Sequence, residues 1–221
     1  LAFMPTAALV DYELSLSVPK RTTADTGIDA LTHAMEAYVS KKANPYSDAQ
    51  AIEAMKLIAP NLRDVYHDGS NRKAREAMML GATLAGIAFS NASVALVHGM
   101  SRPIGAFYHV PHGLSNAMLL PSVTEYSIPA ATKRYADCAR AMSVASIGDD
   151  DKVANTKLLS ELSALNEELN VPTPKEFGID KKDFMNKLEI MAEQAIASGS
   201  PGNNPRVPSN MEIMDIYKLL W

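Results

Sequence analysis

The chain has 221 residues, of which 47 % are apolar and 21 % are charged, and its formal net charge is −4. This composition is typical of a globular protein, and the length allows one sizeable core or two small ones. The mild negative charge and the lack of a basic run argue against nucleic acid or an anionic membrane surface as a partner. No stretch approaches the ~20 consecutive apolar residues of a membrane span.

Strand-like alternation is confined to the first dozen residues, and the chain begins with Leu1 as if entered halfway along a strand. From residue 26 onward, apolar side chains recur at the i, i+3, i+4 spacing of amphipathic helices. The sequence therefore predicts an all-α multi-helix bundle, preceded by a short β remnant of another domain of a longer chain. The predicted helices cover residues 26–39, 47–65, 72–89, 129–143, 153–169, 181–196 and 210–221.

Prolines, glycines and polar residues mark the expected helix ends. Thr23 or Asp25 is expected to cap the first helix and Asn210 the last, because a side-chain oxygen there accepts a free backbone N–H. Pro60 is expected to bend or break the second helix. The Pro- and Gly-containing segment 102–113 is expected to form a turn region.

A single cysteine, Cys138, bears on where the protein works. It lies in a stretch of helical apolar spacing, so we expect a small core residue rather than a reactive thiol. No disulfide can form within the chain, which fits a reducing compartment and predicts a cytoplasmic protein.

Asp29 and His33 are the first pair of residues that suggests chemistry. Residues four apart on a helix leave the same face one turn apart, so this carboxylate and this imidazole could hold one divalent cation. Taken alone, the pair is a weak signal. An aspartate near a helix start and a hydrogen-bonded core histidine would give the same pattern.

His98 and His112 form the second pair. On one straight helix their fourteen-residue separation would correspond to about 21 Å. Pro103, Gly105 and Pro111 lie between them and forbid a straight helix, so the chain can turn and return His112 to the neighbourhood of His98. The pair taken alone is equally compatible with histidines of a core or a loop.

Together these motifs resemble those of the iron-containing (group III) alcohol dehydrogenases. Asp29-x-x-x-His33, the Gly-Met run that follows His98, and Pro111-His112-Gly113 have the order and spacing of that family's signature. The likeness extends from about residue 10 to residue 221. Further matches are the runs at residues 23–34, 89–92 and 204–206.

The resemblance implies a fold, a metal and a reaction. The fold is the family's C-terminal helical domain, which is shared with dehydroquinate synthase-like proteins, and its ligands fall on Asp29, His33, His98 and His112. One carboxylate and three imidazoles suit Fe²⁺ or Zn²⁺. The metal would polarise an alcohol or carbonyl oxygen, and a nicotinamide, NAD or NADP, would carry the hydride.

Three further residues receive expected roles from the resemblance. Phe89 falls where the family has an aromatic wall of the substrate pocket, although core packing explains it as well. Many members have a histidine four residues after the third ligand, where this chain has Arg102, which does not titrate near neutrality. Arg102 is therefore expected to hold a phosphate or carboxylate, and His109, water or the nicotinamide ribose to relay a proton. His67 is given no function.

The phosphate-binding part of such an enzyme is not in this sequence. No Gly-x-Gly-x-x-Gly or Gly-Gly-Gly-Ser loop occurs to present backbone N–H groups to a pyrophosphate, so the cofactor-binding residues stay unknown. We expect residues 1–18 to be a remnant of an N-terminal α/β nucleotide-binding domain, and residues 19–221 to be the helical metal-binding catalytic domain. The expected partners are a small alcohol or aldehyde, the N-terminal domain of the parent chain and further copies in a homo-oligomer. The chain alone should show little dehydrogenase activity.

Two other functions stay open. A lyase or cyclase of the dehydroquinate synthase type also pairs nicotinamide with a metal, although the full four-residue pattern favours the alcohol dehydrogenase. A non-catalytic helical module that merely keeps the histidines would bind no metal.

Overall fold

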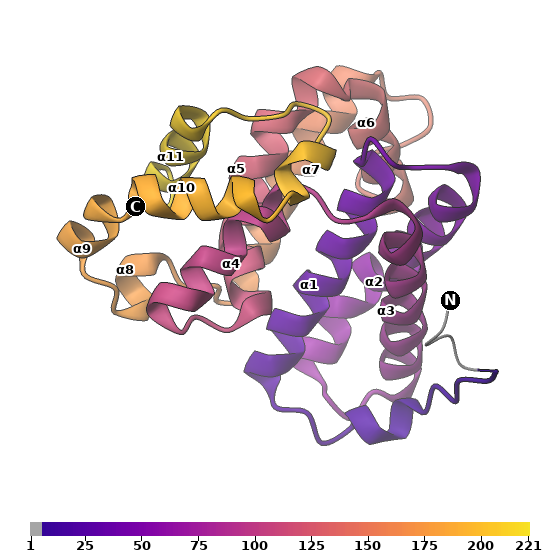
Figure 1. The fold of residues 1–221 in the computed structure, drawn as a ribbon. Helices are drawn as coiled ribbons and strands as arrows, with labels where there is room; N and C mark the ends of the chain where they lie inside the picture. Colours follow the sequence, from indigo (N-terminus) through magenta and orange to yellow (C-terminus); the bar gives the residue numbers. More distant parts are fainter. Residues whose placement is uncertain (1–5) are drawn as a thin grey trace.

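The computed structural model describes residues 6–221, whose regular elements are all helices and which contain no strand (Figure 1). The prediction of an all-α multi-helix bundle is confirmed. The elements in chain order are η1 (Tyr12–Ser15), α1 (Lys20–Val39), α2 (Pro45–His67), α3 (Arg72–Ala92), α4 (Leu96–Tyr108), α5 (His112–Ser127), η2 (Ile128–Ala130), α6 (Thr132–Ala141), α7 (Asp151–Glu168), α8 (Pro174–Phe177), α9 (Lys181–Asn186), α10 (Leu188–Ala197), η3 (Ser200–Asn203) and α11 (Asn210–Lys218).

Helix α1 is the central element, because it packs against α2, α3 and α5 and also contacts α4 and α6. Small residues let these backbones approach closely. A Cβ atom on Gly81 of α3 would lie 2.7 Å from Ile58 of α2, and one on Gly27 of α1 would collide with Leu62. Fourteen of the twenty residues of α1 are buried, so polar side chains on this helix are carried into the interior.

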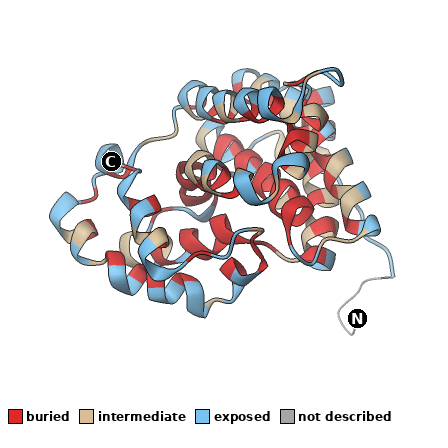
Figure 2. Ribbon diagram, turned by 90° about the horizontal axis from the view of Figure 1, so that it is seen from above, coloured by how far each residue is buried: buried red, intermediate tan, exposed pale blue. Residues whose placement is uncertain are grey.

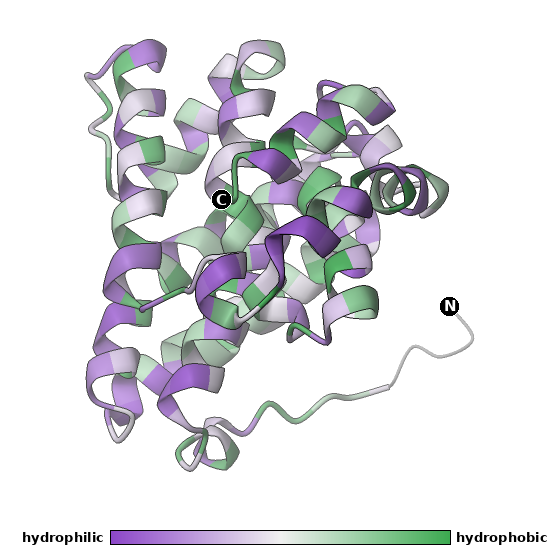
Figure 3. Ribbon diagram, turned by 90° about the vertical axis from the view of Figure 1, so that its left-hand side faces the viewer, coloured by the Kyte–Doolittle hydropathy of each residue, from purple (hydrophilic) through white to green (hydrophobic). Residues whose placement is uncertain are grey.

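The helices have one buried side and one exposed side, as their apolar spacing predicts. In Figure 2 the buried positions line the sides of the helices that face one another, and in Figure 3 single helices carry hydrophobic residues on one side and hydrophilic residues on the other. Cys138 of α6 is completely buried, as expected of a core residue. No single helix of residues 6–221 is long and apolar enough to cross a bilayer; α3 and α4 pass that test only as a pair, which is bent by 104°.

Three prolines lie inside helices, and the sequence led us to expect a bend or break at the first and a turn at the second. Pro60 lies within α2, Pro103 within α4 and Pro121 within α5. A proline removes one backbone hydrogen bond, and that loss is outweighed where neighbouring turns are well buried. Met100 and Ile104, on either side of Pro103, are completely buried. Helix α2 therefore does not break at Pro60, and the expected turn at the start of segment 102–113 is wrong.

The reversal between α4 and α5 is confined to three residues. His109 adopts a left-handed conformation with φ of 56° and ends α4, and Pro111 precedes the first residue of α5. This short connection makes α4 and α5 neighbours that pack on each other.

Several predicted helix ends are displaced. Helix α1 begins at Lys20, so Thr23 and Asp25 lie inside it rather than at its cap. Ser209, not Asn210, caps α11. The predicted helix 181–196 is divided into α9 and α10 at Lys187, and the short helix α8 was not predicted.

The predicted β remnant is not seen in the described residues. Residues 1–5 lie outside them, residues 6–11 have no regular structure, and Tyr12–Ser15 forms a 3-10 turn. A strand requires a partner for its backbone N–H and C=O groups, and residues 6–221 offer none.

Candidate metal centre

Asp29 and His33 leave the same face of α1, as their spacing predicts. The Nδ1 atom of His33 lies 3.7 Å from Oδ1 of Asp29. Both side chains are about one fifth exposed, so they lie at the edge of the interior rather than within it.

The reversal of the chain brings His98 and His112 to the same carboxylate. The Nε2 atom of His98 lies 3.3 Å from Oδ1 of Asp29, and Nε2 of His112 lies 3.7 Å from that oxygen. The ring centroids of His33 and His98 are 4.3 Å apart, and those of His98 and His112 are 5.3 Å apart. The four side chains predicted as ligands therefore meet at the junction of α1, α4 and α5.

The four residues are not equally close to one another. One potential ligand atom from each of Asp29, His33 and His98 lies within 4.8 Å of the other two, and His112 falls outside this tightest group. The His98 side chain is 4 % exposed, whereas that of His112 is 49 % exposed. His112 therefore forms the open side of the cluster.

Electrostatics distinguish the histidines further. Burial lowers the pKa of His33 to about 4, with the nearby His98 acting in the same direction. Burial also acts to lower the pKa of His98, but hydrogen bonds to Asp29 and Glu36 outweigh it and raise the pKa to about 9. Burial acts to raise the pKa of Asp29, and the bond to His98 with the charges of the three histidines lowers it overall. One positive charge is therefore favoured in the cluster, at His98 beside the two carboxylates, and further positive charge on His33 and His112 is disfavoured.

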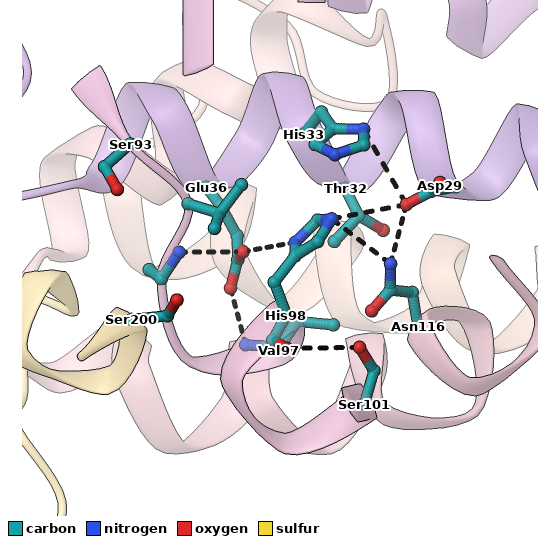
Figure 4. Close-up of polar contacts among 12 residues, drawn as sticks. Asp29, Thr32, His33, Glu36, Ser93, Val97, His98, Ser101, Asn116 and Ser200 are labelled. Carbon is teal, nitrogen blue, oxygen red and sulfur yellow. Dashed lines mark hydrogen bonds and ion pairs between the residues drawn. The ribbon is translucent and has the colours of Figure 1, made fainter. Parts of the chain in front are cut away.

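Asn116 of α5 is a member of the cluster that the sequence reasoning missed. Its Nδ2 atom lies 2.6 Å from Oδ1 of Asp29 and 3.2 Å from Nε2 of His98 (Figure 4). The same atom lies 3.2 Å from Nε2 of His112. Its Oδ1 atom is buried and has no hydrogen-bond partner among the described residues. The four-residue spacing from His112 to Asn116 on one helix is the sequence signal that would have found it.

Glu36 of α1 was also missed. This buried carboxylate lies 2.7 Å from Nδ1 of His98 through Oε2, on the side of the ring opposite to Asp29 (Figure 4). A histidine with one ring nitrogen on a carboxylate can present the other as a lone pair, which is the usual arrangement of metal-bound histidines.

The donor set fits a divalent cation. Oδ1 of Asp29 and the imidazole nitrogens of three histidines converge, and the buried Oδ1 of Asn116 beside them has no hydrogen-bond partner among the described residues. One carboxylate oxygen with several imidazole nitrogens is a borderline ligand set that suits Fe²⁺ or Zn²⁺.

The remaining predicted residues lie around this cluster. The ring of Phe89, near the end of α3, stacks on His33 with centroids 4.4 Å apart. Arg102 is exposed one turn after His98 on α4, and its charge helps to lower the pKa of His112, after the larger effect of burial. His109 is exposed at the end of α4. His67, which was given no function, pairs with Glu168 at 2.8 Å.

Comparison with known proteins decides the family. The profile of the Fe-containing alcohol dehydrogenase family, C-terminal part, matches residues 23–221. The chain belongs to the iron-containing alcohol dehydrogenase family. The recognition made from the sequence motifs is therefore confirmed.

Relatives of this family resemble the chain along nearly its whole length. It is 40 % identical over 216 residues to a 1,3-propanediol dehydrogenase of Citrobacter freundii, and 37 % identical over 218 residues to an NADPH-dependent butanol dehydrogenase of Clostridium saccharobutylicum. These alignments cover 97 % and 98 % of this chain but 55 % of each relative, so the chain spans about half the length of the relatives it matches.

Solved structures of the family share the fold. A crystal structure of a 1,3-propanediol oxidoreductase superposes with a TM-score of 0.90 at 39 % identity, covering 96 % of this chain and 55 % of that one. The iron-containing alcohol dehydrogenase of Thermococcus thioreducens superposes with a TM-score of 0.87 at 34 % identity, covering 98 % and 55 %.

Proposed function

We propose that this chain is the metal-binding part of a dehydrogenase that interconverts an alcohol and an aldehyde or ketone with NAD(P)(H). The observation that carries the proposal is the convergence of Asp29, His33, His98 and His112 from three helices, in a chain that belongs to the iron-containing alcohol dehydrogenase family.

The proposed metal ligands are those four side chains, with Fe²⁺ as the first candidate and Zn²⁺ as the alternative. A bound cation would act as a Lewis acid on the substrate oxygen, while the hydride passes between the substrate carbon and the nicotinamide. The exposed side of His112 is the direction from which a substrate would approach, because His98 on the opposite side is buried.

Three neighbouring residues are proposed to line the path by which the substrate reaches the metal. Phe89 stacks on His33 and offers an apolar wall to the carbon skeleton of a substrate. Arg102 would attract an anionic group of the substrate or of the cofactor, because its charge is felt at His112. His109 is exposed three residues before His112, where it could pass a proton to water.

The proposal extends to the cofactor and to the assembly. One relative is named as NADPH-dependent and one related structure holds NAD⁺, so either nicotinamide is compatible with the proposal. We propose that residues 1–18 belong to the nucleotide-binding domain and residues 19–221 form the metal-binding domain. We further propose that the parent protein is a cytoplasmic homo-oligomer, and the buried lone Cys138 is consistent with a reducing compartment.

Metal analysis tests the first part of the proposal. The purified chain, incubated anaerobically with Fe²⁺ or Zn²⁺ and then desalted, should retain about one equivalent of metal. His98→Ala should retain much less, and His67→Ala, which changes a surface histidine, should behave as the unaltered chain. No retention by the unaltered chain would instead support a non-catalytic helical module.

Activity tests the second part. The isolated chain should not bind NAD(H) at micromolar concentration. A chimera in which it replaces the matching part of the Citrobacter freundii relative should oxidise short alcohols with NAD(P)⁺. Turnover of a phosphorylated sugar acid in place of alcohols would favour the dehydroquinate synthase type of reaction.

A further inference from the structure

Helix α4 begins in the interior of the protein without a cap of its own. Ala95 occupies the capping position and provides no side-chain hydrogen bond, and the residues from Ala95 to Val97 are buried. The first N–H groups of a helix have no partner within the helix, so a buried start needs acceptors from elsewhere.

Glu36 of α1 supplies those acceptors. Its Oε2 accepts from the backbone N–H of Ala95 at 2.9 Å and its Oε1 from that of Val97 at 2.5 Å (Figure 4). The side chain is buried, and its negative charge lies at the positive end of the α4 dipole. The start of α4 is therefore fixed to α1 through this carboxylate.

The same carboxylate also holds the imidazole of His98. Oε2 of Glu36 lies 2.7 Å from Nδ1 of the ring, while Nε2 of the ring lies 3.3 Å from Oδ1 of Asp29. Asp29 and Glu36 are seven residues apart on α1, which places them two turns apart on one face. The ring of His98 thus spans two carboxylates of a single helix.

We propose that Glu36 is the positioning residue of the metal centre. By binding the first N–H groups of α4 and Nδ1 of His98 at once, it directs the lone pair of Nε2 toward the cation that Asp29 shares. This inference rests on the proposed metal-binding function, and it adds a residue that makes no contact with the metal or the substrate.

A neutral amide could not take the place of this carboxylate. Glu36 accepts three N–H groups with two oxygens. In Glu36→Gln one oxygen becomes an NH₂ group, which would face either Val97 N–H or His98 Nδ1–H, and donors facing donors repel. The ring of His98 or the first turn of α4 must then shift.

The test compares metal binding by variants of the purified chain. Zn²⁺ affinity is measured by competition with a chromophoric chelator, and the ligand geometry by the d–d absorption spectrum of the Co²⁺-loaded chain. Glu36→Gln should weaken Zn²⁺ binding by about 10- to 100-fold and should shift the Co²⁺ spectrum. Glu36→Asp keeps the charge but is one methylene shorter, and it should recover part of the affinity.

Tyr217→Phe is the matched control. The Tyr217 hydroxyl is buried and donates to the carbonyl oxygen of Met100 at 2.7 Å, so this variant also loses a buried hydrogen bond to α4 but leaves His98 untouched. It should bind Zn²⁺ as the unaltered chain does and leave the Co²⁺ spectrum unchanged. Equal loss in Tyr217→Phe and Glu36→Gln would reduce Glu36 to a purely structural role and overturn the proposal.

The outcomes separate the two claims. Unchanged affinity and spectrum in Glu36→Gln overturn the positioning role and leave metal binding intact. Absence of metal binding in the unaltered chain overturns the proposed function, and this inference with it. If Glu36→Gln does not fold, proton NMR of the Zn²⁺-loaded unaltered chain decides: an exchange-protected, low-field Nδ1–H resonance of His98 supports the proposal, and its absence contradicts it.

Discussion

Helices α4 and α11 both begin against a glutamate, and they do so in opposite ways. Helix α11 begins at the surface, where Ser209 and Glu212 form a capping box within four residues of sequence. Helix α4 begins in the interior, where the glutamate comes from α1, about sixty positions earlier in the chain. The surface start is stabilised by its own sequence, whereas the buried start depends on the tertiary structure and shares its acceptor with His98, a proposed metal ligand.

Removal of the buried carboxylate should have the largest effect on stability. Glu36→Ala leaves two backbone N–H groups and His98 without their acceptor in the interior. Breaking a buried charge pair in this way destabilises proteins by about 3–5 kcal/mol. Urea unfolding in the presence of a chelator measures the change, and a loss below about 1 kcal/mol would mean that water or a rearranged side chain replaces Glu36.

Helix α5, whose first turn lies against α1 at the buried Gly113, provides an intermediate effect. It begins without a side-chain cap, and a Cβ atom on Gly113 would collide with the backbone carbonyl of Asp25 in α1. Gly113→Ala should therefore push the start of α5, and His112 with it, away from α1, with a loss of about 1–3 kcal/mol. Chelator competition should show weaker Zn²⁺ binding as well.

Gly86 of α3 is the matched control for that substitution. A Cβ atom there would meet nothing within 4 Å. Gly86→Ala should raise the free energy of unfolding by about 0.5–1 kcal/mol, because alanine favours the helix interior. Equal losses at both glycines would contradict the proposed difference between buried and open positions.

Removing the cap at the surface start of α11 should lower the free energy of unfolding by less. Ser209 accepts from the backbone N–H of Glu212, and loss of such a cap in Ser209→Ala should lower the free energy of unfolding by about 1 kcal/mol. Urea unfolding measures the change. Metal affinity should not change, and a change would show that the two ends of the molecule are coupled.

The smallest effect concerns the charge of Glu212, and it depends on pH. Hydrogen bonds from Ser209, first from its backbone N–H, lower the pKa of Glu212 to about 2 from 4.5. A lowered carboxyl pKa contributes stability that is present above pH 4.5 and is lost as the pH falls toward 2. Glu212→Gln keeps a capping residue but loses this charge-dependent contribution, so its melting temperature should be slightly lower at pH 7 and its decline in acid shallower. An equally steep decline would assign the acid sensitivity to other groups.

Sequence reasoning recovered what depends on neighbouring residues. The helical periods, the pair Asp29 and His33, and the family motif all lie within short windows of the chain. Helix ends were less accurate: Ser209 rather than Asn210 caps α11, and α4 continues through Pro103 because its flanking turns are buried. A local rule for proline cannot include burial that arises from distant helices.

The residues that were missed act over long distances in the sequence. Glu36 binds groups of α4 that lie 59 to 62 positions away, and Asn116 binds Asp29 over 87 positions. Their local patterns were visible, since Glu36 follows Asp29 by seven residues and Asn116 follows His112 by four. Such spacings place side chains on a common face of one helix, but they do not identify the helix or the polar groups that pack against that face.

The ring of His98, held between two acids of one helix, limits how this protein could be retuned for another cation. Exchanging His98 for cysteine or aspartate is the obvious route to a softer or harder ligand set. Either exchange would remove the ring nitrogen that binds Oε2 of Glu36 and would leave that buried carboxylate without its charged partner. Laboratory evolution of the cation preference should therefore change positions 36 and 98 together, and libraries that vary His98 alone should yield mostly variants of lowered stability.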